Sequence, residues 1–361
     1  MDVLDARDGD PGVRARLLAW LAVQRTFALA PQQLPDALRE AGRPEAWPDA
    51  PGVAPLPRAE GERALATLAR HAVRAVPIAS FLYPDRLRRL PDAPALLLVR
   101  GTPALLAVRA VAIVGARAAT EYGRAIARRL AFDLARAGLA VVSGLARGID
   151  AAAHEGALEA GGATLAFQAC GPERTYPLAH RTLADRIAGQ GAVLTEFPVG
   201  TPPLAAYFPL RNRLISALSE AVVVVEGREQ SGSLVTARRA ADQGIDVLAV
   251  PGPVGSPTSA GPNALIHDGA RLVRDAADVL RELKLPVPEA AGSSRSPRLS
   301  DPRLRSILGT LRREPLSRDA LAQRLHRSPA ELAAPLLELE LAGRVREDRD
   351  GKLRVVSRPS L

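Results

Sequence analysis

Short apolar runs that alternate with helical patterns limit the fold of this chain more than any other feature of its sequence. The runs lie at 111–114, 139–142, 163–167, 192–195, 221–225 and 246–250. Apolar residues at helical spacing fill intervals between them, as at 121–137 and 233–243. Strands that alternate with helices form a mainly parallel sheet with helices on both faces. The sequence therefore predicts an α/β domain over 96–290.

Different patterns flank this domain. Residues 1–95 carry apolar residues at helical spacing, such as Leu17, Leu21 and Leu38, broken by a proline-rich stretch, which predicts a small helical domain with an irregular connection. The segment 286–302 has the composition of a linker. Amphipathic patterns then precede two strand-like runs around Asp350-Gly351; the patterns lie at 303–313, 317–325 and 329–342. This order is typical of a winged helix, which we expect within 291–361.

The basic residues both suggest a partner and exclude some chemistry. The 48 Lys and Arg residues exceed the 39 Asp and Glu residues, and the formal net charge of +9 favours a polyanionic partner. Fifteen basic and nine acidic residues fall in 291–361, so this region supplies most of the excess. The lysines are Lys284 and Lys352, and neither follows a G-x-x-x-x-G sequence. A P-loop nucleotide site and Schiff-base catalysis are therefore excluded.

The few cysteines and histidines limit metal and redox chemistry. Cys170 is the single cysteine and the chain has five histidines, so we expect neither an internal disulfide nor a Cys/His zinc site. The N-terminal MDVLDARDGD lacks the basic and apolar regions of a secretory signal. No apolar run approaches the roughly 18 residues of a membrane span. These features predict a cytoplasmic protein that does not contact a membrane.

Three loops at the carboxyl ends of predicted strands contain residues suited to phosphate. They span 115–120, 143–148 and 226–236, and supply glycines, hydroxyl groups and Arg117. Ligands of parallel α/β sheets bind at this edge, where helix N-termini present free N–H groups. The first loop lacks G-x-G-x-x-G, and the second strand runs into Ser143-Gly144 instead of an acidic residue, which excludes NAD and FAD. We expect a phosphate-bearing ligand and no cofactor.

The segment 207–213 adds aromatic and basic side chains just ahead of an apolar helix. Its sequence, YFPLRNR, pairs Tyr207 and Phe208 with two arginines and an amide. Aromatic rings stack on bases and arginines bind phosphates, so the segment suits a ligand that has phosphates and stacked bases. Arginine at a helix start also opposes the helix dipole and favours a bound anion.

Acid–base groups lie near the strand ends too. Asp150, His154, Glu196 and Glu226 occupy such positions, and the sequence alone does not show that any two converge. Asp150 and His154 are four residues apart, a spacing that favours a local hydrogen bond over catalysis.

Five collinear runs resemble the DNA-processing protein A family (DprA, also called Smf). They are 112–123, 143–154, 195–219, 231–244 and 250–270, and begin AIVGARAATEYG and SGLARGIDAAAH. The resemblance implies an extended Rossmann-like domain that binds single-stranded DNA, dimerises and loads the RecA recombinase in natural transformation, without catalytic activity. Single-strand-binding protein is a further candidate partner. The resemblance also implies a sterile-alpha-motif-like domain over 1–95 and a winged helix over 291–361.

The resemblance assigns a phosphate pocket residue by residue. The positions that match are Gly115, Arg117, Ser143, Gly144, Arg211, Asn212, Arg213, Ser231, Gly232 and Ser233, and we add Arg147 and Thr236 as neighbours. One loop departs from the pattern: 171–180 reads GPERTYPLAH where the family commonly has G-L-D-x-x-Y-P followed by a basic residue and Asn. A basic DNA contact from that loop is therefore in doubt, with Arg174 or Arg181 as substitutes.

Two other functions stay open on the sequence. LOG-type nucleotide phosphoribohydrolases share a Rossmann-like fold and carry a P-G-G-x-G-T-x-x-E loop, whereas the corresponding SGSLVTA at 231–237 lacks the glutamate. A duplex-DNA regulator that uses the basic winged helix is the second alternative.

Overall fold

The computed structural model describes residues 3–27, 44–50, 52–287, 302–341, 344–348 and 350–355. The chain divides into two compact units, 1–286 and 287–361. In the described residues, no helix is both long enough and apolar enough to cross a membrane.

A ten-stranded sheet organises the first unit, in the order β1-β2-β3-β7-β6-β5-β4-β8-β9-β10. The strands are β1 Leu4–Asp5, β2 Val73–Pro77, β3 Leu96–Gly101, β4 Ala110–Val114, β5 Ala140–Ser143, β6 Thr164–Phe167, β7 Ala192–Thr195, β8 Ala221–Val224, β9 Asp246–Ala249 and β10 Arg271–Leu272. Seven consecutive strands of the sheet run parallel to one another: β7, β6, β5, β4, β8, β9 and β10. At the other edge, β1 pairs antiparallel with β2, β2 with β3, and β3 with β7. The predicted α/β fold with a mainly parallel sheet is therefore confirmed.

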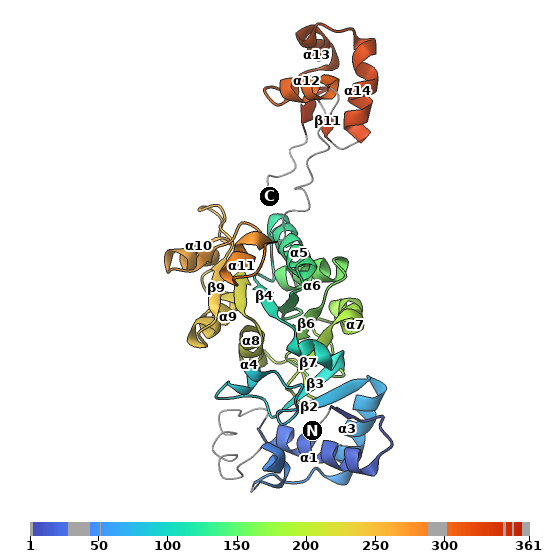
Figure 1. Cartoon of the computed structure of the whole chain (residues 1–361), viewed down its shortest axis with the longest axis vertical. Coiled ribbons are helices and arrows are strands. Elements are labelled where there is room, and N and C mark those ends of the chain that lie inside the picture. The colour runs from blue at the N-terminus through green and yellow to red at the C-terminus, as the bar shows by residue number, and fades with distance from the viewer. Residues whose placement is uncertain are drawn as a thin grey trace. The chain divides into compact units, whose positions relative to one another are not determined.

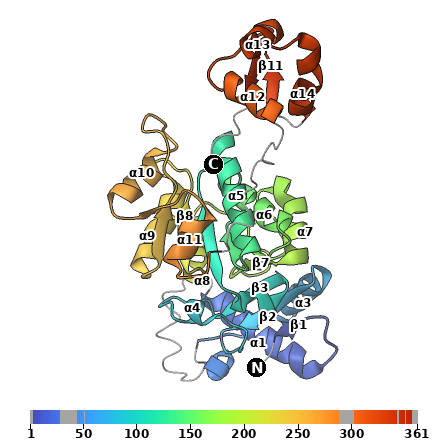
Figure 2. The same cartoon turned by 45° about the horizontal axis from the view of Figure 1, so that its top comes forward.

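Helices cover both faces of this sheet. They are α1 Pro11–Phe27, α3 Arg58–Arg70, α4 Asp85–Arg88, α5 Glu121–Arg136, α6 Ile149–Glu159, α7 Arg181–Gln190, α8 Tyr207–Leu218, α9 Gly232–Asp242, α10 Ala260–His267 and α11 Ala276–Glu282. Short 3₁₀ helices occupy η2 Pro44–Asp49, η3 Pro103–Ala107 and η4 Leu178–His180. In both views α5, α6 and α7 lie side by side along one face (Figures 1 and 2).

The strand β4 shows why the sheet is buried on both sides. Its Ala112 and Val114 belong to a core shared with α1, α8 and α9, whereas Val111 and Ile113 belong to a core shared with α5, α6 and α11. Successive side chains of a strand point to opposite faces, so a strand covered on both sides must be apolar throughout. That requirement is what made the central strands recognisable as uninterrupted apolar runs.

The N-terminal region differs from the separate domain expected over 1–95. The strands β1, β2 and β3 extend the central sheet, and Leu98 of β3 pairs with Thr195 of β7. Trp20 of α1 and Leu68 of α3 share one core with Leu97, so the helices bury their apolar faces against these strands. No boundary near residue 95 separates two compact units. The expected helix around Leu38 lies outside the described residues, and the likeness to a sterile alpha motif stays a prediction.

The second unit has the predicted order of helices and hairpin. It contains α12 Pro302–Leu311, α13 Arg318–Leu325, α14 Pro329–Leu341 and the antiparallel strands β11 Val345–Glu347 and β12 Leu353–Val355. Its own core includes Ile307, Leu321, Leu339 and Leu353. Three helices and a hairpin around a separate core are the architecture of a winged helix.

Candidate functional site

A cavity of the first unit lies where the strand order reverses. The chain runs from β4 outward through β5, β6 and β7, then returns to place β8 on the other side of β4. Loops diverge at such a point, and ligands of open α/β sheets bind there. A cavity of about 530 Å³ opens between the loops that follow β4 and β8, and α8 forms part of its wall.

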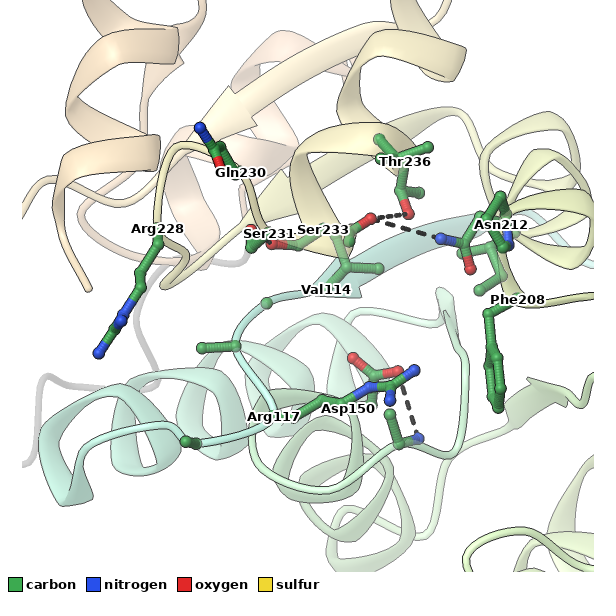
Figure 3. Close-up of a pocket in the computed structure, with 18 of the residues that line it drawn as sticks. Val114, Arg117, Asp150, Phe208, Asn212, Arg228, Gln230, Ser231, Ser233 and Thr236 are labelled. Atoms are coloured by element: carbon green, nitrogen blue, oxygen red, sulfur yellow. Dashed lines mark hydrogen bonds between the residues drawn. The ribbon is translucent and has the colours of Figure 1, made fainter. Parts of the chain in front are cut away.

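Two groups of side chains face each other across this cavity. Ser231, Ser233, Thr236 and Asn212 lie along one side, and Arg117 and Asp150 lie opposite them (Figure 3). A second cavity of about 280 Å³ adjoins the first, because Arg117, Ala146 and Phe208 line both. All the predicted site residues except Ser143 and Arg213 line one of the two cavities.

The side formed by α9 presents hydroxyl and N–H groups. Ser231 is the N-cap residue of α9, and its Oγ lies 2.6 Å from the Oγ of Ser233. Asn212 Nδ2 donates to the carbonyl of Gly232 across 3.4 Å, which ties α8 to this helix start. The first turn of α9 has no acidic residue, so no side chain there neutralises the positive end of the helix dipole. This wall is suited to bind an anion.

Backbone requirements explain two glycines of the opposite wall. Gly148 has φ of 79°, and a Cβ there would overlap the carbonyl oxygen of Ala116, so the first two loops pack against each other only with glycine. At Gly144 a Cβ would overlap the guanidinium of Arg211. Gly144 thus leaves the space that the Arg211 side chain fills.

Arg211 is buried beneath the loops. It is 3% exposed, and its Nη1 donates to the carbonyl of Phe167 at the end of β6. Burial lowers the pKa of Arg211 to about 10, against the opposing effect of Asp150, so the guanidinium stays protonated at neutral pH. Burial likewise raises the pKa of Asp150, whose carboxylate accepts N–H groups of Gly144 and Ala146 at 3.1 and 3.3 Å. Arg211 and Asp150 together fix the second loop and place a buried positive charge at the cavity wall.

An exposed row of cationic and aromatic groups borders the cavities. The guanidinium carbon of Arg117 lies 4.8 Å from the centroid of the Phe208 ring. The ring centroid of Tyr176 lies 5.6 Å from that of Phe208, and Tyr176 is 44% exposed. Arg147, also exposed, lines the smaller cavity with Tyr176. We call Arg117, Phe208, Tyr176 and Arg147 the aromatic platform.

The structure places two predicted site residues elsewhere. Arg213 is 5% exposed and forms ion pairs with Glu196 at 2.5 Å and Asp92 at 3.0 Å, away from both cavities. Two residues apart on a helix are separated by about 200°, so Arg211 and Arg213 cannot face the same site. Ser143 is fully buried, and its hydroxyl donates to the carbonyl of Ile113 across 2.7 Å. Both residues support the site from within the fold.

The acid–base candidates have structural partners instead of meeting one another. Glu226 accepts from the backbone N–H and hydroxyl of Thr120 at 2.9 and 2.6 Å, which fixes the start of α5. His154 does not bond to Asp150, contrary to the expectation from their spacing. The Thr164 hydroxyl donates to the carbonyl of Val141, so it accepts from His154 Nδ1, which lies 2.7 Å away. Burial lowers the pKa of His154 to about 3.

The divergent loop 171–180 reaches the platform through an aromatic residue. Tyr176 and Pro177 line the smaller cavity, and His180 Nδ1 donates to the carbonyl of Leu145 across 2.9 Å. Arg174 pairs with its neighbour Glu173 at 3.0 Å. Burial raises the pKa of the Cys170 thiol to about 12, so this cysteine is an inert core residue.

Sequence reasoning did not assign Arg228, Gln230 and Tyr176 to the site. Arg228 and Gln230 line the larger cavity from the loop after β8, with the Arg228 side chain directed outward (Figure 3). They stand inside the loop 226–236 that the sequence singled out, but residue type alone did not separate them from their neighbours. In the described residues, no group of three or more His, Cys, Asp or Glu side chains is arranged to hold a metal ion.

Comparison with known proteins adds a family to this geometry. Residues 74–284 match the family model for DNA recombination-mediator protein A, and residues 288–351 match the DprA winged helix domain. Protein Smf of Escherichia coli is 39% identical over 336 residues, which cover 91% of this chain and 87% of that protein. DNA processing protein DprA of Bacillus subtilis is 41% identical over 222 residues, or 61% of this chain and 75% of that protein.

Solved structures agree with the sequence relatives. DNA processing protein A of Streptococcus pneumoniae superposes with a TM-score of 0.63 at 33% identity, covering 72% of this chain and 95% of that one. The protein of the same name from Helicobacter pylori, whose structure concerns its single-stranded DNA binding mode, gives a TM-score of 0.52 at 31% identity, covering 56% and 92%.

Proposed function

The chain belongs to the DNA recombination-mediator protein A family, and from that premise we propose that its switch-point cavity and aromatic platform bind single-stranded DNA. In this proposal the protein protects incoming DNA and passes it to the RecA recombinase, without chemistry of its own. The observation that carries it is the row Arg117, Phe208 and Tyr176, because it joins a cavity lined by anion-binding groups to two aromatic rings in contact with each other.

Phosphate binding is supported by the two walls of the larger cavity. The N-terminus of α9, with Ser231 and Ser233, offers N–H and hydroxyl donors. Arg117 stands opposite as an exposed guanidinium, and the buried Arg211 adds a fixed positive charge. A backbone phosphate between them gains donors from both sides, which is the arrangement that anions seek at helix starts.

Base binding is supported by the platform. Phe208 is half-buried and has Arg117 against one side, while the Tyr176 ring lies within stacking distance and is more exposed. Every base has a flat π-face, so stacking on such rings tolerates any sequence. A base pair in a duplex hides these faces, which makes the platform selective for single strands.

The partners of the acidic groups support a binding protein over a hydrolase. Glu226 holds the start of α5 and Glu196 is paired with Arg213, so neither carboxylate stands in the cavity as a free base. Asp150 lines the cavity but is engaged by two backbone N–H groups and the charge of Arg211. These contacts disfavour the phosphoribohydrolase alternative.

Recombinase loading, contact with single-strand-binding protein and a homodimer rest on the family resemblance. A protein that merely coats DNA competes with a recombinase for the same phosphates, so loading requires a protein contact that offsets this competition. We place that contact and the dimer interface outside the platform, because the platform residues are occupied by DNA during transfer.

The proposal is tested by titrating fluorescent oligodeoxythymidylate with the full chain over a series of salt concentrations. Arg117→Ala removes one phosphate contact, so the slope of log affinity against log salt should fall by about 0.7. Arg136→Ala removes another exposed arginine, which lies at the end of α5 and lines neither cavity, and serves as the matched control. Equal effects of the two variants, or tighter binding to a duplex than to a single strand, would contradict the proposal.

A further inference from the structure

The larger cavity of the DNA site extends beyond the groups that the proposed phosphate contact uses. Arg117 and Phe208 line both cavities, so they mark the end of the larger cavity that adjoins the aromatic platform. Arg228, Gln230 and Thr258 line the larger cavity alone, from the loops after β8 and β9. Figure 3 shows Arg228 and Phe208 on opposite sides of this cavity. A strand bound at the platform therefore still has part of the cavity to cross.

The loop after β8 holds the backbone of Arg228 close to the start of α9. The Arg228 carbonyl accepts from the N–H of Ser231, the N-cap residue of α9, across 2.9 Å. The preceding residue, Gly227, donates its N–H to the carbonyl of Thr258 across 2.7 Å, and its own carbonyl accepts from the N–H of Gly261 across 2.8 Å. These bonds fix the point from which the Arg228 side chain extends. A side chain on a fixed backbone loses less entropy when it binds a ligand.

The Arg228 guanidinium has no partner within the described part of the chain. The residue is exposed, and neither a hydrogen bond nor an ion pair joins its side chain to another described residue. Its acidic neighbours in the sequence, Glu226 and Glu229, do not line the cavity, and Glu226 is bonded to Thr120. The charge of Arg228 is therefore available to bind a phosphate in bidentate geometry.

The larger cavity also has more room than one phosphate group fills. Its volume of about 530 Å³ lies within the range of about 300–1,000 Å³ of sites that enclose whole small molecules. A phosphate at the start of α9, opposite Arg117, leaves the end that Arg228 lines without an anion. In a single strand the backbone itself supplies the next phosphate, one nucleotide farther along.

We propose that Arg228 binds a second backbone phosphate, so that the single strand crosses the start of α9 from the aromatic platform toward the loop after β8. This inference rests on the proposed function and adds a contact to the same site. One phosphate lies between Arg117 and the N-terminus of α9. The next lies at Arg228, where the exposed amide of Gln230 is a further donor. The two arginines therefore neutralise different phosphates.

The salt dependence of binding shows whether two phosphates are held. In the titration with fluorescent oligodeoxythymidylate, Arg228→Ala should lower the slope of log affinity against log salt by about 0.7, and Arg117→Ala/Arg228→Ala by about 1.4. Arg239→Ala should leave the slope unchanged, because Arg239 is an exposed arginine in the last turn of α9 that lines neither cavity. If the double variant loses no more slope than Arg117→Ala alone, both arginines bind one phosphate and the proposal is overturned.

A terminal phosphate on a short ligand isolates the second contact. The dinucleotide d(TpT) has one internal phosphate, and its 5′-phosphorylated and 3′-phosphorylated forms each have a second. Displacement of the fluorescent oligonucleotide from the full chain measures their affinities. One phosphorylated form should bind about tenfold more tightly than d(TpT), and Arg228→Ala should abolish this gain. The end that gives the gain sets the direction of the strand. No gain from either end, or a gain that persists in Arg228→Ala, would overturn the proposal.

The same variants separate a failure of this contact from a failure of the DNA site. If Arg117→Ala and Phe208→Ala weaken binding while Arg228→Ala matches Arg239→Ala, the second contact is wrong and the site stands. Wild-type affinity in all four variants would contradict the site itself. Arg228 is exposed and its side chain has no partner among the described residues, so its replacement leaves the fold intact.

Discussion

Replacing Phe208 by alanine separates base stacking from phosphate binding. The Phe208 ring contacts both Arg117, whose guanidinium carbon lies 4.8 Å from its centroid, and Tyr176, whose ring centroid lies 5.6 Å away, so its removal takes away the residue that links the aromatic platform. Stacking of one base on an aromatic side chain contributes about 1–3 kcal/mol. Because 1.4 kcal/mol corresponds to a tenfold change, the dissociation constant for a single strand should rise roughly 5- to 150-fold.

The salt dependence distinguishes this effect from a lost charge. Phe208 neutralises no phosphate, so Phe208→Ala should shift every point of the salt series equally and keep its slope. Fluorescence anisotropy with oligodeoxythymidylate measures both quantities. Phe81→Ala is the control, since Phe81 is 72% exposed and lines neither cavity of the site. Wild-type affinity in the Phe208 variant, or a reduced slope, would refute the stacking argument.

Two further outcomes follow from the same structure. The folded pKa of His154, about 3, lies below the ordinary 6.5, so its contribution to stability is present above pH 6.5 and is lost as the pH falls toward 3. Urea unfolding measures how far the free energy of unfolding falls between pH 6.5 and pH 5. This fall should be about 2 kcal/mol smaller for His154→Gln than for the wild type, and equal falls would contradict burial of a neutral imidazole. In a strand-exchange assay, the protein is added to single-stranded DNA that single-strand-binding protein already covers, followed by RecA. The wild type should shorten the lag before strand exchange, and Phe208→Ala should not. If the wild type only slows strand exchange, the protein acts as a plain coat protein.

The central sheet was predictable because its strands are buried on both faces. Strands such as β4 and β8 must then be apolar at every position, and they stand out from helices of period 3.6. The strand β10 has two residues, both exposed, and left no such signal. β2 was missed because a helical domain was expected over 1–95. β3, with the sequence LLLVRG, lies at the start of the predicted α/β domain but was not named among its strands.

The site was predictable down to its loops but not to the direction of each side chain. The glycines and hydroxyls after β4 and β8 follow from the edge of the sheet at which ligands bind. Arg211 and Arg213 look equivalent in sequence, and only the position of α8 shows that one borders the cavity while the other pairs with Glu196. Tyr176 matches the tyrosine of the family pattern G-L-D-x-x-Y-P, but only a basic contact was considered for that loop, so the contact of Tyr176 with Phe208 was not predicted.

Photo-crosslinking tests the central claim most directly. A single strand that carries 5-iododeoxyuridine is irradiated with the full chain, and the attached peptides are identified by mass spectrometry. The iodinated base reacts with aromatic rings on which it stacks, so crosslinks should map to Phe208 and Tyr176 and should disappear with excess unlabelled single strand. Crosslinks confined to 302–355, or spread over the surface without these two residues, would contradict a DNA site at the switch point of the sheet.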